Sequence, residues 1–393
     1  MSLASCVTLP QKPVNAVVGA SDSRVRQVGA DVLQRGGNAA DAMVAMMMTS
    51  GVVMPSRTGL GGGGICQVLD PNEGRVKTLN FLHRRMNGSA VPALSKGAFS
   101  LQKNYGQLRW QDTLSDAIRL AKQDVVVSER LAKDILNAKG LPLEWKKIKK
   151  GDKISRKDLA STLSKISEKG SGVFYNGEVA ESLISQEKAF SSEDLKSYRA
   201  TFMDSMDVVT PTGKSYFPNP SAISTLGYNL WNSLEDPQKR EEALSMEQSL
   251  NERTVAVSEA AYGENFFAAD KNGLIIVCSL SNGGLFGNKK YLKEGFFLAE
   301  PFSREKSEAF FFNVLQTNPD VTDVVSMTAG VGGHAWPDAL FLFKGDKSSI
   351  SDLSDERVEE LEGFVSLKCL KGYPNQPQTC QEKQNIIFVY SKD

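Results

Sequence analysis

Histidine is almost missing from this sequence, whose 393 residues include only His83 and His334. Ser-His-Asp hydrolase sites and most catalytic zinc sites are built with histidine. The chain also has no Gly-x-Ser-x-Gly nucleophile turn, and its His and Cys residues show no metal-ligand spacing. We therefore expect no conventional serine-hydrolase site, no metal and no cofactor.

An excess of either charge is missing as well, because 46 Lys and Arg residues balance 46 Asp and Glu residues. Domains that bind nucleic acid through charge carry a clear basic excess, so we expect no nucleic-acid partner. The densest basic stretch, residues 145–153, is interpreted as a solvated loop. The apolar stretch that ends at Pro55 is shorter than the roughly 20 residues of a membrane span, which predicts a buried helix.

Cysteine is sparse, with five residues, which are too few for a disulfide scaffold and odd in number. Residues 3–6 read LASC and are similar to the end of a bacterial lipoprotein signal, where the cysteine is lipidated. This predicts a tether over residues 1–14 and a location in the bacterial periplasm or at the outer membrane. The only membrane contact would be a lipid anchor at Cys6. The alternative is a chance tetrapeptide in a cytosolic, structural protein.

Two of the other cysteines, Cys369 and Cys380, bracket a segment rich in proline, glycine and asparagine, which is typical of a turn-rich loop. In an oxidising compartment a disulfide can close this loop and stabilise the protein by restricting the unfolded chain. We predict that disulfide on the condition of export. The alternative is two free thiols in a cytosolic protein.

Apolar spacing divides the chain into a mainly helical region and later strands. Residues 265–269 and 274–278 flank Asp-Lys-Asn-Gly, a pattern that predicts a β-hairpin. Helical spacing, i, i+3 and i+4, predicts helices over 21–34, 39–54, 110–122 and 128–136, and strands are expected at 14–20, 65–69, 323–328, 339–344 and 386–390.

Glycines dominate residues 59–64, GLGGGG, which contain the pattern G-x-G-x-x-G. A dinucleotide site needs that pattern after a strand and before a helix. Here the predicted helix comes first and the strand second. We interpret these glycines as positions where the backbone passes close to another part of the molecule.

Several ordered motifs together resemble the γ-glutamyltransferase (glutathione hydrolase) family. They cover most of residues 15–200 and 263–345, and their order and spacing are more specific than any one of them. The motifs are GGNAADA at 36–42, GLGGGG at 59–64, VSERLA at 127–132, FYNGEVAE at 174–181, DLKSYRA at 194–200, DKNG at 270–273 and LFG at 285–287.

The resemblance implies an α/β (α+β) fold, the four-layer αββα sandwich of the N-terminal-nucleophile (Ntn) hydrolases. It implies one integrated domain, with residues 15–262 similar to the large subunit and 263–393 similar to the small subunit. In that family the precursor cuts itself, and the threonine thus exposed attacks the substrate with its own α-amino group as base. A Gly-Gly turn holds the oxyanion.

The family's nucleophile is missing from its expected position. Counting back from Asp270 without gaps places Gly263 there, and glycine has no hydroxyl for self-cleavage or turnover. Thr254 is a weak replacement candidate, because it lies nine residues earlier and so falls off the core strand.

Other positions of the family's site have also changed. The arginine that binds the substrate carboxylate falls on Leu82, with Arg84 and Arg85 close by. The acidic pair that binds the substrate amine falls on Ser303 and Arg304, and a cation there repels an ammonium group. Losing one charge-assisted contact costs about 1.5–3 kcal/mol. Because several such contacts are lost, γ-glutamyl recognition is not expected.

Some polar groups of the site persist. Gly332 and Gly333 preserve an oxyanion-like turn, for which the alternative is a turn that the fold requires. The Thr-x-Thr motif of the family's site corresponds to Ser279 and Ser281, which also carry hydroxyls. The candidate ligand cleft therefore comprises Arg84, Arg85, Asn265, Ser279, Ser281 and Asn282.

The sequence thus predicts an unprocessed, non-catalytic relative of γ-glutamyltransferase with a binding or scaffolding role at the bacterial envelope. Its partner would be a small peptide or a protein. The alternative is an active Ntn-type γ-glutamyl or amide hydrolase with a displaced nucleophile.

Overall fold

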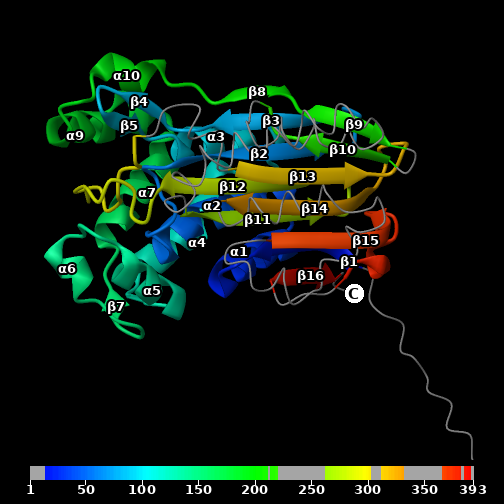
Figure 1. Cartoon of the computed structure of the whole chain (residues 1–393), viewed down its shortest axis with the longest axis horizontal. Helices are drawn as coiled ribbons and strands as arrows, with labels where there is room; N and C mark the ends of the chain where they lie inside the picture. Colours follow the sequence, from blue (N-terminus) through cyan, green and yellow to red (C-terminus); the bar gives the residue numbers. More distant parts are fainter. Residues whose placement is uncertain are drawn as a thin grey trace, which may run out of the picture.

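A large antiparallel sheet organises the molecule (Figure 1). The structure, a computed structural model, describes residues 14–210, 213–219, 262–301, 311–331, 365–381 and 385–390. In spatial order the seven strands of this first sheet are β16 (Ile386–Tyr390), β1 (Val14–Ala20), β11 (Tyr262–Asp270), β12 (Ile275–Gly283), β2 (Gly63–Asp70), β3 (Arg75–Phe81) and β8 (Thr201–Asp204).

A second antiparallel sheet packs on one face of the first. Its five strands are, in spatial order, β15 (Val365–Tyr373), β14 (Val324–Val331), β13 (Phe311–Thr317), β10 (Gly213–Phe217) and β9 (Met206–Thr210). The core between the sheets is apolar, with Phe267 and Val277 of the first sheet packed in one cluster with Leu315 and Met327 of the second. Alternate residues of β11, such as Phe266, point to the opposite face of the first sheet and join a different cluster.

Helices cover that opposite face. The central one, α2 (Ala39–Val53), is buried along its whole length, which explains why its sequence is apolar on every side. Asn38 and Asp41 form a capping box that fixes where α2 begins. The other helices are α1 (Ser23–Gln34), α3 (Leu94–Tyr105), α4 (Trp110–Lys122), α5 (Glu129–Asn137), α6 (Leu143–Lys146), α7 (Lys157–Lys169), α8 (Gly172–Asn176), α9 (Glu178–Gln186), α10 (Ser192–Ser197) and the 3-10 helix η2 (Pro377–Thr379).

Two short β-ribbons complete the described chain: β4 (Arg84–Met86) pairs with β5 (Ser89–Val91), and β6 (Val125–Val126) pairs with β7 (Lys153–Ile154). Figure 1 shows α5, α6, α9 and α10 at one end of the molecule and β15 and β16 at the other. The described residues thus supply a helical layer and two sheets, three of the four layers expected of an αββα sandwich.

Most predicted elements are confirmed. The strand expected at 14–20 is β1, so the first sheet begins at the last residue of the expected tether. The β11–β12 hairpin and the helix over 110–122 also form. The expected strand at 339–344 lies outside the described residues. The supposed loop at 145–153 instead contains the end of α6 and buries Trp145 among aromatic rings.

Candidate functional site

Gly263 lies near the start of β11, in the middle of the first sheet. It pairs with Ser281 of β12, whereas the preceding residue, Tyr262, pairs with Gly283, so the register shifts and Asn282 forms a bulge. Bulges of this kind recur beside functional sites, where they re-aim side chains. The position assigned to the family nucleophile is therefore buried, central and irregular, but it carries no side chain.

The hydroxyl of Ser281 touches the peptide bond that precedes Gly263. Its Oγ donates to the carbonyl oxygen of Tyr262 at 2.5 Å and accepts a hydrogen bond from the N–H of Gly283 at 2.8 Å. A donor aimed at a carbonyl oxygen stabilises negative charge that develops there during attack. This geometry would support cleavage between residues 262 and 263 if a nucleophile were present.

Asn265 of β11 pairs with Ser279 of β12, two residues along the strand from Gly263, and this pair connects the two sheets. The Oγ of Ser279 is 2.6 Å from Oδ1 of Asn265 and 2.5 Å from Oδ1 of Asn313 on β13. The amide of Asn313 also donates to the carbonyl of Ile65 at 3.2 Å. All three polar side chains are fully buried, so they hold the interior together rather than line an open cleft.

The glycine-rich run before β2 passes beneath this region. A Cβ atom at Gly62 would lie 2.4 Å from Oδ1 of Asn282 and 2.5 Å from the carbonyl oxygen of Ser281. A Cβ atom at Gly61 would lie 2.1 Å from the carbonyl oxygen of Phe297. The predicted close approach of the backbone is therefore confirmed, and it occurs directly beside the candidate site.

The arginines of the predicted cleft lie elsewhere. Arg84 and Arg85 are on the exposed ribbon strand β4, and the guanidinium of Arg84 lies over the ring of Tyr198, 5.6 Å from its centroid. Leu82, at the family's arginine position, is buried. The structure thus brings Asn265, Ser279 and Ser281 close to Gly263, but it does not bring the arginines into contact with them.

His83 follows β3 and is a buried polar residue that sequence reasoning did not use. Burial lowers its pKa to about 4, and a contact with the backbone of Glu300 offsets part of this shift. A Cβ atom at Gly63 would lie 2.7 Å from the backbone nitrogen of His83. A neutral imidazole therefore packs at the same end of the sheet as Ser281 and Gly263.

A buried group of charges lies on the helical side of β11, and the sequence did not reveal it. Arg57 donates to both oxygens of Asp134, at 2.7 and 2.8 Å, and both side chains are buried. Glu264 is also buried, and its Oε1 lies 2.9 Å from Nη1 of Arg130, an ion pair without hydrogen-bond geometry. Burial raises the pKa of Glu264, and Arg130 and Arg57 partly oppose that shift.

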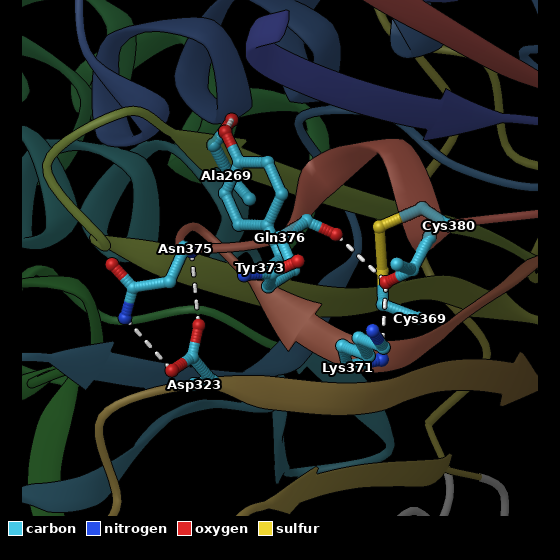
Figure 2. The surroundings of a disulfide bond; sticks show 9 residues. Ala269, Asp323, Cys369, Lys371, Tyr373, Asn375, Gln376 and Cys380 are labelled. Carbon is cyan, nitrogen blue, oxygen red and sulfur yellow. Dashed lines mark hydrogen bonds between the residues drawn. A yellow bond between two sulfur atoms is a disulfide. The ribbon is translucent and has the colours of Figure 1, made fainter.

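Two disulfides lie within the part of the chain that the structure describes. Cys369 and Cys380 close the loop that leads from β15 through η2 (Figure 2). In this loop Asn375 donates to the carboxylate of Asp323 through both its backbone and its side chain, at 2.9 and 2.8 Å. The second disulfide joins Cys66 and Cys278, which face each other across β2 and β12.

Four predicted site residues, Cys6, Thr254, Gly332 and Gly333, lie outside the described residues, as do Ser303 and Arg304. Among the residues that the structure does describe, no three His, Cys, Asp or Glu side chains gather in a way that could hold a metal ion. None of the described helices combines the length and apolar character needed to cross a bilayer.

Comparison of the sequence with known proteins identifies one family. The sequence model described as gamma-glutamyltranspeptidase matches residues 26–88 and 82–265, more than half of the chain. Glutathione hydrolase 3 of Arabidopsis thaliana is 30% identical over 250 residues, which cover 55% of this chain and 39% of that protein. The chain thus spans less than half the length of this curated relative.

Solved structures resemble the fold. The crystal structure of cephalosporin acylase from Bacillus halodurans matches with a TM-score of 0.65 at 18% identity, covering 81% of this chain and 77% of that one. The gamma-glutamyltranspeptidase from Pseudomonas nitroreducens, complexed with L-DON, matches with a TM-score of 0.50 at 24% identity, covering 59% and 78%. These identities are low, so the likeness concerns the fold alone.

Proposed function

Because the chain belongs to the gamma-glutamyltranspeptidase family and has the fold of the Ntn hydrolases, we propose that it is a non-catalytic member with a binding or scaffolding role. Gly263 carries this proposal. In the Ntn mechanism one residue must supply both the nucleophilic hydroxyl and, after cleavage, the α-amino base. The ungapped count back from Asp270 assigns that position to Gly263, which lies in β11 and offers no hydroxyl.

The residues after Gly263 do not replace the missing group. Glu264 points to the helical side and is held near Arg130, whereas Asn265 is buried against Ser279. Ser281 has a hydroxyl at the right place, but its Oγ already contacts the carbonyl of Tyr262 from β12. It therefore suits a supporting role better than that of an N-terminal nucleophile.

The disulfides support an envelope location. Four of the five cysteines are paired in the structure, and the fifth is Cys6. Disulfides persist in oxidising compartments such as the bacterial periplasm and are rare in the cytosol. We propose that Cys6 is lipidated and that the protein faces the periplasm or the cell surface, where it binds a small peptide or a protein.

Denaturing mass spectrometry of the reduced protein tests the absence of self-cleavage. We expect one chain without an internal cut, whether or not the residues before Cys6 have been removed. Two fragments, one of which begins with threonine or serine, would overturn the proposal and identify the nucleophile directly.

Acyl labelling of the full-length gene product, with Cys6→Ala as the control, tests the lipid anchor. We expect the label on the wild-type protein and not on the Cys6→Ala variant.

A second candidate function, an amide hydrolase with a displaced nucleophile, is favoured by the contact between Ser281 and the carbonyl of Tyr262. A γ-glutamyl-anilide assay separates the two candidates. The non-catalytic proposal expects no turnover above a heat-denatured sample. Turnover that Thr254→Ala abolishes would favour the hydrolase.

A further inference from the structure

A cluster of positive charge lies around two stacked tyrosine rings. The rings of Tyr175 and Tyr198 are 5.9 Å apart and nearly parallel. The ammonium of Lys96 lies 5.1 Å from the centre of the Tyr175 ring, and the guanidinium of Arg84 lies 5.6 Å from that of Tyr198. Arg199 adjoins the stack, because its Nη1 donates to the carbonyl of Tyr198 at 2.9 Å. We call Arg84, Lys96 and Arg199 the cationic rim.

The cationic rim has no carboxylate partners among the described residues. Other cations at this end of the molecule do, since Lys290 pairs with Glu187 and Lys169 pairs with Glu178. Burial and the neighbouring charge of Arg199 both lower the pKa of Lys96. Positive charges placed close together without anions repel each other, and such an arrangement is favourable when an anion binds.

The rim rests on a fixed platform. The hydroxyl of Tyr175 donates to the carbonyl of Pro92 at 3.0 Å and accepts from the N–H of Lys96 at 3.2 Å. The hydroxyl of Tyr198 donates to the carbonyl of Leu82 at 2.9 Å. Both rings are buried beneath the cations, so binding there would require little further ordering.

The rim belongs to the same end of the molecule as the candidate site. Leu82 directly follows β3 and precedes His83, and Gly63 of the neighbouring strand β2 pairs with Ser281. Figure 1 shows β4, β5 and α10 together near the end of the first sheet at which β3 ends. Tyr198 is therefore tied through Leu82 to the end of the sheet at which Gly63 and Ser281 pair, although Ser281 itself is buried.

We propose that the cationic rim binds an acidic peptide segment whose carboxylates contact Arg84, Lys96 and Arg199. This inference rests on the proposed binding role and names the chemistry of the partner. The cations come from three separate segments, with Lys96 over one ring of the stack and Arg84 over the other. Carboxylates spaced along an extended peptide, about 7 Å apart at alternate residues, suit that spread better than one compact anion does. Arginine is also well shaped for bidentate contact with a carboxylate.

Binding of fluorescein-labelled hexaglutamate to the intact chain, followed by anisotropy at low salt, tests the proposal. We expect saturable binding that weakens at least tenfold in the double variant Arg84→Gln/Arg199→Gln. The matched control is Lys139→Gln, which removes an exposed charge outside the rim and should change affinity less than twofold. Thermal melting of each variant shows whether it is folded, and Arg199→Gln alone serves if the double variant is not.

Three outcomes would overturn the proposal: no binding, an equal loss in the Lys139 control, or equal displacement of the peptide by inorganic phosphate or a single-stranded oligonucleotide at matched charge. The last would identify the rim as a general anion surface. The mass measurement on the whole chain is independent of this result. Self-cleavage with intact peptide binding would refute only the non-catalytic role, and an intact chain without peptide binding would refute only the rim.

Discussion

At the scale of single residues, the non-catalytic proposal depends on Gly263, which lies in β11. The ungapped count back from the Asp-Lys-Asn-Gly turn assigns the nucleophile position to Gly263, and this assignment stays a prediction. The contact between Ser281 and the Tyr262 carbonyl was not predictable, because it depends on a bulge at Asn282 that leaves no sequence signal. Glu264 and Arg130 were missed because they meet only after folding.

His83 should make the protein sensitive to mild acid. Its pKa falls from 6.5 to about 4 in the folded state, so its contribution to stability is fully present above pH 6.5 and is lost as the pH falls toward 4. The shift corresponds to about 3 kcal/mol. We expect His83→Leu to lose less stability than the wild type between pH 7 and pH 4, measured by urea unfolding at each pH. Parallel pH profiles for the two proteins would contradict this prediction.

Asp134 should be among the most sensitive charged residues of the helical side. Its carboxylate accepts two hydrogen bonds from buried Arg57 and one from the hydroxyl of Ser56. Removing one partner of a buried ion pair typically costs about 3–5 kcal/mol. We expect Asp134→Asn to lower the free energy of unfolding by that amount. Asp112→Asn is the matched control, because Asp112 pairs with Arg109 at the surface and such pairs contribute at most about 1 kcal/mol. Equal losses of unfolding free energy in the two variants would show that burial does not make the Asp134 ion pair more important than the exposed one.

At the scale of elements, prediction succeeded where local signals agree. Strands β1 and β16 and helix α4 have the expected bounds, since each combines an apolar pattern with clear flanking residues. Strand β3, RVKTLNF, does not alternate cleanly and was missed, as was β13. Both strands form because they complete sheets whose partners come from distant parts of the chain, a tertiary effect that overrides local preference.

The glycine run before β2 gives a test at this scale. Gly61→Ala would place a Cβ atom against the carbonyl of Phe297, a backbone group that cannot turn away. Overpacking of this kind costs about 1–3 kcal/mol. Gly59→Ala is the control, because a Cβ atom there would meet nothing within 4 Å. We expect thermal unfolding to separate the two variants clearly, with Gly59→Ala near the wild type. A normal melting temperature for Gly61→Ala would show that the close approach does not constrain the chain.

At the scale of the whole molecule, the two parts of the chain on either side of Gly263 are built into one sheet. Strand β11 lies between β1, from the start of the described chain, and β12, which in turn pairs with β2. The disulfide between Cys66 and Cys278 adds a covalent link across 212 residues of sequence. Sequence reasoning did not predict this pairing, because only the sheet register brings these two cysteines together.

The assignment of Gly263 to the nucleophile position can be tested by placing a hydroxyl at that residue. In Gly263→Thr the new Oγ can attack the Tyr262 carbonyl, which Ser281 already contacts. The C–N bond between residues 262 and 263 then breaks, the hydroxyl proton passes to the departing nitrogen, and an ester joins Tyr262 to the threonine Oγ. The resulting ester is then hydrolysed by water, which leaves a carboxylate on Tyr262 and a free amino group on the new residue. We expect slow cleavage between residues 262 and 263, visible as two fragments by mass spectrometry after reduction.

The same experiment without a reductant should show the two fragments still joined, with the mass of one added water, because Cys66 and Cys278 lie on opposite sides of the cut. Gly263→Ala is the matched control, since it adds a Cβ atom without a hydroxyl and should remain intact. Adding Ser281→Ala to the threonine variant should slow cleavage, because the hydroxyl donor to the Tyr262 carbonyl is then lost. If Gly263→Thr stays whole for days while folded, a hydroxyl at residue 263 is not sufficient for cleavage, and the surroundings of β11 do not support attack on the Tyr262 carbonyl.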